Sequence, residues 1–202
     1  MAKKLENSLL NMFLSLTVIC VVVGGLLGLV ADVTAQPIQN AKDAAQKAAI
    51  AAVAPEFDAV ADPQNVEQPN GLEAIVFAVS KGGEVVGHAV QATTLKGFGG
   101  KVIIMFGFDL DGNITGYNVL DCSNETPGLG SKIPVWFQKG QKGDVIGKNP
   151  STNNLSVSKD GGEVDAITAA TISSRAFCDA IAQAASVLTG TDVKTAASAQ
   201  VE

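Results

Sequence analysis

The sequence predicts an α+β domain in which antiparallel β hairpins pack with a few helices, attached to one N-terminal transmembrane helix. An uncharged apolar run covers residues 8–31. Alternating stretches with Gly- and Asp-containing turns lie between residues 72 and 120, and apolar residues recur at helical spacing after residue 172. Alternating stretches joined by such turns are typical of β hairpins, and strands followed by a helix are typical of the α+β class.

The apolar run at residues 8–31 predicts a membrane anchor. As a helix its roughly 24 residues span about 36 Å, which exceeds the roughly 30 Å hydrocarbon core of a bilayer. Lys3 and Lys4 precede the run, and Asp32 is the first charge after it. Because basic residues stay on the cytoplasmic side, we expect residues 1–7 in the cytoplasm. The main domain is then on the periplasmic, or extracytoplasmic, side of a single-pass protein of the cell inner membrane.

Two other N-terminal signals are alternatives to the anchor. Val33-Thr34-Ala35 before Gln36 fits a signal-peptidase site, so a cleaved signal peptide stays open. The apolar run is longer than the roughly 7–15 residues of a signal-peptide core, which favours a retained helix. A lipoprotein signal is disfavoured, because Cys20 lies inside the apolar run.

After the anchor, residues 32–71 read as a linker with a membrane-proximal helix. An Ala-rich stretch predicts a helix over residues 39–53 that ends before Pro55, and residues 56–71 contain loop-forming Pro and Asn. We expect one hairpin from residues 72–80 and 84–92, and a second from 101–108 and 114–120. Asp111-Gly112 supplies the turn chemistry of the second hairpin. Residues 97–100, Gly-Phe-Gly-Gly, predict a corner or a close backbone approach, with the corner favoured.

The remaining segments complete a domain at residues 72–192. Residues 135–137 predict a short helix or an apolar lid, and residues 155–158 a short strand. The helical spacing of apolar residues predicts a helix that begins near residue 172 and stops at Gly190. Residues 193–202 are polar and Ala-rich, and predict a flexible tail.

Composition excludes several classes of function. The net charge is −6 and no basic cluster follows the first residues, so nucleic-acid binding is disfavoured. Three cysteines without a C-x-x-C pair, and one histidine, are too few ligands for iron–sulfur, haem or structural zinc sites. We therefore predict no metal site. Cys122 and Cys178 are compatible with a disulfide or with buried thiols.

The segment Asp165-Ala-Ile-Thr168-Ala169-Ala170-Thr171 carries the strongest functional signal. Small residues at 169 and 170 let a phosphate approach the backbone, and the helix that begins here offers free N–H groups to an anion. On residue chemistry alone, a Thr-rich helix N-cap explains the segment as well.

A second segment is Glu125-Thr126-Pro127-Gly128-Leu129-Gly130, followed by Ser131 and Lys132. Its Pro and Gly residues predict a turn. Gly128 and Gly130 can take positive φ, and Leu129 between them is then an isolated apolar side chain suited to a flat aromatic ring. An ordinary surface turn is the alternative.

Together the two segments resemble the D-x-x-[ST]-[GA]-A-T and ETPGLG motifs of proteins that carry FMN covalently on threonine. The resemblance is strongest to the G subunit of the Rnf ion-translocating electron-transport complex, whose sister is the C subunit of the sodium-pumping NADH:quinone reductase. It covers most of the chain. Two positions depart from the pattern: Ala169 stands where many relatives have Gly, and Ser123 where relatives often carry His.

The resemblance implies a cofactor site in which Thr171 bears the FMN phosphate. Thr168 would bond the phosphate or cap the helix, and Lys132 would offset the phosphate charge. Asp165 would orient the hydroxyl or a transferase-bound Mg²⁺; a role in the turn or in the charge balance of the helix start is the alternative for Asp165. Leu129 would press on the isoalloxazine ring while Glu125 and Thr126 shape the loop. The full set implied is Asp165, Thr168, Ala169, Ala170, Thr171, Ser173, Glu125, Thr126, Gly128, Leu129, Gly130 and Lys132, and none is expected to be catalytic.

The same resemblance implies an electron-relay flavoprotein in a membrane-bound ferredoxin:NAD oxidoreductase that translocates Na+ or H+. The expected partners are other subunits of that complex, membrane lipid, and a flavin transferase that attaches FMN from FAD during maturation. The alternatives are the sister protein of the sodium-pumping reductase, a stand-alone flavinylated reductase outside the cytoplasm, and a membrane-anchored binding module without flavin.

Overall fold

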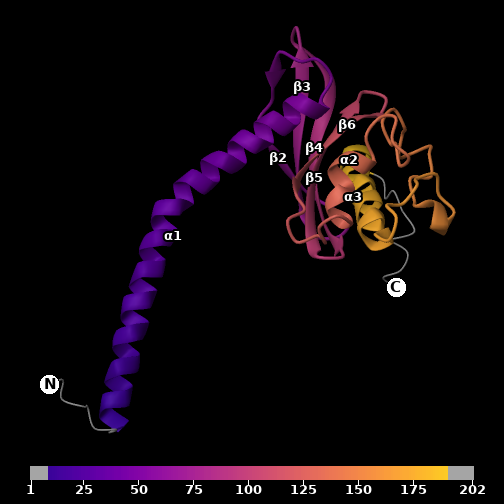
Figure 1. Ribbon diagram of the computed structural model, residues 1–202. Coiled ribbons are helices and arrows are strands. Elements are labelled where there is room, and N and C mark those ends of the chain that lie inside the picture. The colour runs from indigo at the N-terminus through magenta and orange to yellow at the C-terminus, as the bar shows by residue number, and fades with distance from the viewer. Residues whose placement is uncertain (1–8, 191–202) are drawn as a thin grey trace. The chain divides into compact units, whose positions relative to one another are not determined.

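The computed structural model describes residues 9–190, and it confirms the α+β class. The predicted cytoplasmic residues 1–7, the first residue of the predicted anchor and the predicted tail at 193–202 lie outside this range. The elements in chain order are α1 (Leu9–Val53), β1 (Ala59–Val60), β2 (Gln64–Glu67), β3 (Glu73–Lys81), β4 (Glu84–Gly97), β5 (Gly100–Asp109), β6 (Ile114–Asp121), the short 3₁₀ helix η1 (Gly130–Lys132), α2 (Ile133–Trp136), the 3₁₀ helix η2 (Ser158–Asp160) and α3 (Thr171–Thr189) (Figure 1).

The chain divides into two units, and the boundary between them falls within helix α1. One unit is Met1–Ala44, and a second, compact unit begins at Ala45. The sequence predicted separate helices at 8–31 and 39–53, but α1 is continuous through the interval and contains Pro37. Side-chain bonds at helical spacing, from Gln36 to Asn40 and from Gln39 to Asp43, support the helix there.

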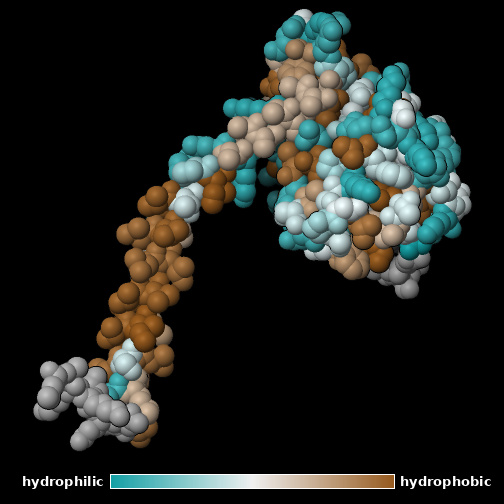
Figure 2. Space-filling view, viewed as in Figure 1, coloured by the Kyte–Doolittle hydropathy of each residue, from teal (hydrophilic) through white to brown (hydrophobic). Residues whose placement is uncertain are grey.

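The described part of the first unit consists of residues 9–44 of α1. Helix α1 is the one helix among residues 9–190 that is long and apolar enough to cross a membrane, and its apolar stretch is not buried inside the protein. Figure 2 shows hydrophobic residues over most of the visible surface of this segment. A helix that is apolar all round needs a protein core or a membrane around it, and here the protein supplies no core. The chain is therefore membrane-anchored.

The compact unit is built on a six-stranded antiparallel sheet in the order β1-β3-β4-β5-β6, with β2 also pairing with β3. Gly97 pairs with Gly100 where β4 turns into β5, so residues 97–100 form the predicted corner and join the two hairpins into one meander. Strands β1 and β2 lie in the stretch predicted as loop. Both are short and mostly exposed, and they form by pairing with β3 rather than from an alternating pattern of their own.

The two faces of the sheet are covered by different helices. Ala49, Ile50 and Val53, in the last turns of α1, pack with Phe77, Val79, Ala89 and Met105. On the other face, Ile104, Phe106 and Phe108 of β5 face α3 and the long loops. Successive residues of a strand point to opposite faces, so β5 contributes to both cores.

Helix α3 is fixed to the sheet by apolar and polar contacts. Phe177 stacks on Phe137 with ring centroids 4.0 Å apart and meets Tyr117 edge-on at 4.9 Å. Asp179, fully buried in α3, accepts a hydrogen bond from Thr94 at 2.8 Å and pairs with Lys96 at 3.0 Å. These contacts set the position of the first turn of α3, where the motif residues lie.

Two predictions need correction or completion. Residues 155–158 do not form a strand: Val157 makes one isolated bridge with Val164, and the chain then enters η2. Cys122 and Cys178 are free thiols rather than a disulfide. Cys178 is buried, and this burial is the main reason that the pKa of its thiol is raised to about 12. The nearby Asp160 and Asp179 carboxylates raise this pKa further.

Candidate functional site

The motif threonine is the first residue of the last long helix. Thr171 begins α3, and the capping residue Ala170 provides no side-chain hydrogen bond to the first turn. The first N–H groups of a helix have no partner within the helix, and here no cap side chain takes their place. The helix start therefore offers donors and the positive end of its dipole to an anion.

The turn before α3 has an unusual backbone. Ala169 has a φ of 62°, and it is the only non-glycine residue with positive φ in the described part of the chain. This conformation brings the Cβ of an L-residue close to the following carbonyl oxygen, at a cost of about 1–2 kcal/mol. The glycine that the family motif often carries at this position would avoid that cost. Among the residues that have a side chain, alanine has the smallest one.

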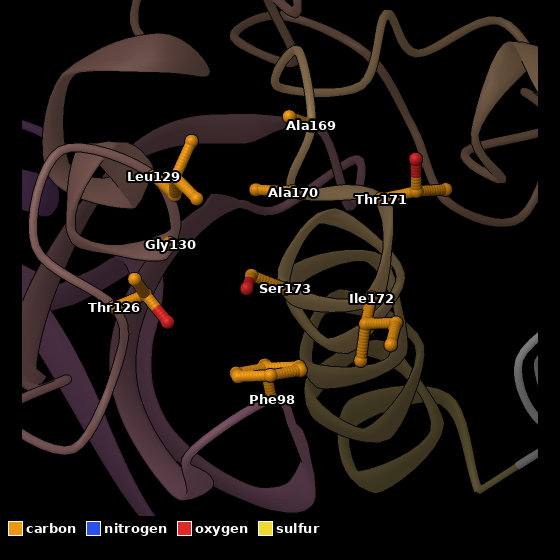
Figure 3. A pocket seen from close by; sticks show the side chains of 9 residues that line it. All are labelled: Phe98, Thr126, Leu129, Gly130, Ala169, Ala170, Thr171, Ile172 and Ser173. Carbon is orange, nitrogen blue, oxygen red and sulfur yellow. The ribbon is translucent and has the colours of Figure 1, made fainter.

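A cavity of about 280 Å³ lies beside Thr171 and is open to solvent. Three segments distant in sequence line it, as Figure 3 shows: the β4–β5 turn, the loop after β6, and the start of α3. Its lining residues are Phe98, Thr126, Leu129, Gly130, Ala169, Ala170, Thr171, Ile172 and Ser173.

The Glu125 carboxylate joins these three segments. Glu125 is buried, accepts a hydrogen bond from the Ser173 hydroxyl at 2.5 Å, and accepts another from the Gly99 N–H at 3.1 Å. The carboxylate occupies the space that a Cβ at Gly130 would need. The loop, the β4–β5 turn and the first turn of α3 are therefore held around one buried acid.

The cavity has an apolar side. Phe98 is 66% exposed and Ile172 is 48% exposed, although both are large hydrophobic residues. Leu129 is partly buried and packs against the main core. Figure 3 shows Leu129 across the cavity from the start of α3, with the Phe98 ring at one end. Exposed apolar side chains around a concavity indicate a ligand with an apolar surface.

The Thr171 hydroxyl faces a positive charge. The Lys159 ammonium, from η2, donates a hydrogen bond to the Thr171 oxygen at 3.2 Å. A lysine ammonium has donors only, so the threonine oxygen accepts. The apolar side of the cavity and this cationic, donor-rich helix start are different chemical environments placed side by side.

The structure brings together part of the predicted set. Seven predicted residues line the cavity: Thr126, Leu129, Gly130, Ala169, Ala170, Thr171 and Ser173. Glu125 lies behind the lining. Gly128 has a φ of 76°, as its turn position requires, whereas Gly130 is not among the residues with positive φ. Its glycine is explained by the neighbouring Glu125 carboxylate instead.

Four predicted residues do not line the cavity: Gly128, Lys132, Asp165 and Thr168. Lys132 is exposed at the end of η1, and Thr168 is exposed in the turn before α3. The Asp165 carboxylate accepts a hydrogen bond from Ser158 at 3.2 Å, and its carbonyl oxygen accepts one from the Trp136 indole at 2.8 Å. The described contacts of Asp165 are thus with the neighbouring loops rather than with the Thr171 hydroxyl.

Three residues of the site were missed by sequence reasoning. Phe98 lies in the Gly-Phe-Gly-Gly segment, which was interpreted as a corner. It is a corner, and it also presents an aromatic ring to the cavity. Ile172 carries the signal of an apolar residue beside the motif threonine. Lys159 had no signal, since only the tertiary fold brings η2 to Thr171.

The residues present fit a flavin mononucleotide. A phosphate suits the small residues, the helix start and Lys159, and an aromatic ring system suits Phe98, Leu129 and Ile172. The cavity is slightly smaller than the range of about 300–1,000 Å³ usual for ligand pockets. A ring held there would keep part of its surface in contact with solvent or a partner.

Comparison with known proteins agrees with this fit. Residues 97–186 match the FMN-binding domain family. The G subunit of an ion-translocating oxidoreductase complex from Stutzerimonas stutzeri is 32% identical over 179 residues, covering 85% of this chain and 77% of that protein. The chain belongs to this G-subunit family.

Other members of the family match over shorter stretches. The Aliivibrio fischeri (strain ATCC 700601 / ES114) protein is 38% identical over 112 residues, covering 54% of this chain and 52% of that protein. The G subunit of the Na(+)-translocating ferredoxin:NAD(+) oxidoreductase complex of Acetobacterium woodii is 33% identical over 133 residues, covering 63% and 61%. In several of these matches the chain spans about half the length of the relative.

The FMN-binding domain of this G-subunit family member contains the whole site. Residues 97–186 begin at the β4–β5 turn and extend through most of α3, so all nine lining residues fall within the match. FMN is therefore the cofactor of this domain.

Proposed function

We propose that this chain carries FMN as a phosphoester on Thr171 and acts as an electron-relay subunit of a membrane-bound, ion-translocating oxidoreductase complex. The observation that carries the proposal is the position of the Thr171 hydroxyl. It is partly exposed at the start of α3, beside an open cavity with apolar side chains on one side and Lys159 on the other.

The protein's own residues would hold the two ends of the cofactor. The first turn of α3 would donate N–H groups to the phosphate, and the small side chains of Ala169 and Ala170 leave room for its oxygens. Phe98, Leu129 and Ile172 would exclude water from one side of the ring system. Bound FMN supplies the electron-transfer chemistry, while the protein sets its position and environment.

Glu125 would act through the scaffold. Its hydrogen bonds to Ser173 and Gly99 fix the distance between the start of α3 and the β4–β5 turn that carries Phe98. The phosphate end and the ring end of the site are thereby connected through one buried carboxylate.

Covalent attachment on Thr171 is tested by mass and fluorescence. The full chain, purified from its native membrane, should show one added FMN less one water by intact mass. Its denatured band should fluoresce under ultraviolet light. Thr171→Ala should abolish both signals, and Thr171→Ser should keep the hydroxyl needed for them. Flavin that stays covalently bound to Thr171→Ala would refute the attachment point.

The membrane topology is also part of the proposal. Lys3 and Lys4 before the apolar run favour a cytoplasmic N-terminus, with the compact unit on the opposite side of the inner membrane. A covalent bond suits that location, because a dissociated FMN would be lost from the cell. Protease added outside spheroplasts should cleave the compact unit, whereas protection of that unit would contradict this topology.

The relay role requires partner subunits. The names of the relatives describe subunits of multi-subunit oxidoreductase complexes, and one of them acts on ferredoxin and NAD(+) with Na(+) translocation. We expect this chain to copurify with several hydrophobic subunits, and to receive its FMN from a flavin transferase that uses FAD. Purification of the chain alone from its native membrane, in mild detergent, would favour a stand-alone flavinylated reductase.

A further inference from the structure

The short helix η2 is held at both ends beside the start of α3. At one end, the Ser158 hydroxyl donates a hydrogen bond to the Asp165 carboxylate at 3.2 Å. At the other end, the Arg175 guanidinium donates two hydrogen bonds to the Asp160 carboxylate, at 2.8 Å and 2.7 Å. The residue between these fixed points is Lys159.

This arrangement directs Lys159 at one atom. Its ammonium lies 3.2 Å from the Thr171 oxygen, while the residue itself is exposed. Nearby Arg175 is already paired with Asp160 through both oxygens of that carboxylate. Lys159 is thus a cation placed at the hydroxyl of Thr171 and still open to an incoming group.

We propose that Lys159 assists the attachment of FMN to Thr171 by stabilising charge at the reacting oxygen, an inference that rests on the proposed function. In the attachment step, the Thr171 oxygen bonds to the phosphorus of FAD next to riboflavin. The bond from that phosphorus to the bridging oxygen of the pyrophosphate breaks, AMP leaves with the electron pair, and the hydroxyl proton passes to a base or to water. No electron is gained or lost.

Lys159 acts on the charge that develops in this step. The threonine oxygen becomes more negative as its proton leaves, and the phosphoryl oxygens of FAD that approach it are already anionic. An ammonium at hydrogen-bond distance from the threonine oxygen stabilises both. After attachment, the same ammonium lies beside the phosphodiester. A buried donor of this kind changes rates by about 10²–10³-fold. Lys159 is exposed and screened by water, so we expect an effect of about tenfold.

The same geometry assigns a task to the motif carboxylate Asp165. Its described side-chain bond is to Ser158, the residue directly before Lys159. Asp165 therefore positions Lys159 by holding η2, rather than by contact with the Thr171 hydroxyl. Arg175, three residues after Ile172 in α3, holds η2 from its other end through Asp160.

The test is the rate of FMN attachment. The full chain in detergent would be incubated with purified flavin transferase, Mg²⁺ and saturating FAD, and the fluorescent band followed after denaturation. We expect Lys159→Met to lower the rate at saturating chain concentration by about tenfold, and Lys159→Arg to recover most of it. Lys142→Met, which removes the charge of another exposed lysine, should leave the rate unchanged. All three variants should have the thermal midpoint of the wild type.

Each result decides a different point. Equal rates for wild type and Lys159→Met would overturn the inference and leave the proposed function intact. A slower Lys159→Met that Lys159→Arg does not rescue, or whose thermal midpoint falls, would indicate a structural role and also overturn the inference. A wild-type chain that takes up no flavin would overturn the proposed function, and this inference with it.

Discussion

At the scale of single residues, the site combines positions with different physical requirements. Gly130 is required by space, because the Glu125 carboxylate occupies the place of a side chain. Ala169 is in a conformation that favours glycine, with a φ of 62°. The two small residues thus serve different purposes, although both belong to motifs rich in Gly and Ala.

Ala169→Gly should stabilise the protein. The substitution removes a left-handed alanine that costs about 1–2 kcal/mol, while glycine makes the unfolded chain more flexible by about 0.4–1 kcal/mol. We expect a net gain of about 0.5–1 kcal/mol, seen as a rise of about 2 °C in the thermal midpoint. Ala176→Gly, at a buried position inside α3, is the control and should lower stability by about 1–2 kcal/mol, from lost helix propensity and a lost buried methyl group. A decrease for Ala169→Gly would mean that the left-handed turn is not strained.

At the scale of elements, the loop that leads into α3 is organised by charge. The ion pair between Asp160 and Arg175 ties η2 to α3 with two hydrogen bonds. The Arg175 guanidinium, chiefly through these hydrogen bonds, holds the pKa of Asp160 below its ordinary value. Because the folded state favours the ionised carboxylate, this pair stabilises the protein above the ordinary aspartate pKa. The contribution disappears as the pH falls through the lower folded pKa.

Asp160→Asn should therefore destabilise the protein in a pH-dependent way. At pH 7 we expect a loss of about 1 kcal/mol, since Arg175 is about one-third exposed and water screens the pair. The difference from wild type should stay constant between pH 7 and pH 5, and shrink below about pH 4. Urea unfolding at pH 7, 5 and 3 measures it. Glu163→Gln, which removes a more exposed pair with Lys148 at 3.9 Å, should cost less than about 0.5 kcal/mol. A pH-independent loss for Asp160→Asn would assign the effect to packing.

At the scale of the whole molecule, one helix serves two surroundings. The apolar part of α1 has exposed side chains that a bilayer would cover, whereas Ala49, Ile50 and Val53 are buried on the sheet. The compact unit begins at Ala45. Part of the core of the extramembrane domain therefore comes from the same helix as the membrane anchor.

Two shortened chains separate these roles. A chain that begins at Lys42 should partition into the aqueous phase of a detergent extraction and keep the thermal midpoint of the full-length domain. A chain that begins at Ala54 lacks Ile50 and Val53, and should lose about 4 kcal/mol, because each large buried side chain contributes about 1.5–3 kcal/mol. Equal midpoints for the two shortened chains would show that the end of α1 is not part of the domain core.

Local patterns predicted much of the fold. The anchor, the strands between residues 73 and 121, the short helix near residue 135 and the helix stop at Gly190 all have signals within a few residues. Strands β1 and β2 escaped prediction because they exist only through pairing with β3. Residues 32–38, predicted as a linker between two helices, are instead part of the continuous helix α1, which contains Pro37.

By itself, the sequence determined the membrane anchor, the α+β class, the flavin motifs and the threonine proposed to carry the cofactor, since each depends on neighbouring residues. Only the tertiary structure decided what surrounds that threonine. Phe98, the Glu125 carboxylate and Lys159 reach the start of α3 from three separate loops. Their distances from Thr171 depend on how the sheet, α3 and η2 pack together, and no pattern of neighbouring residues encodes those distances.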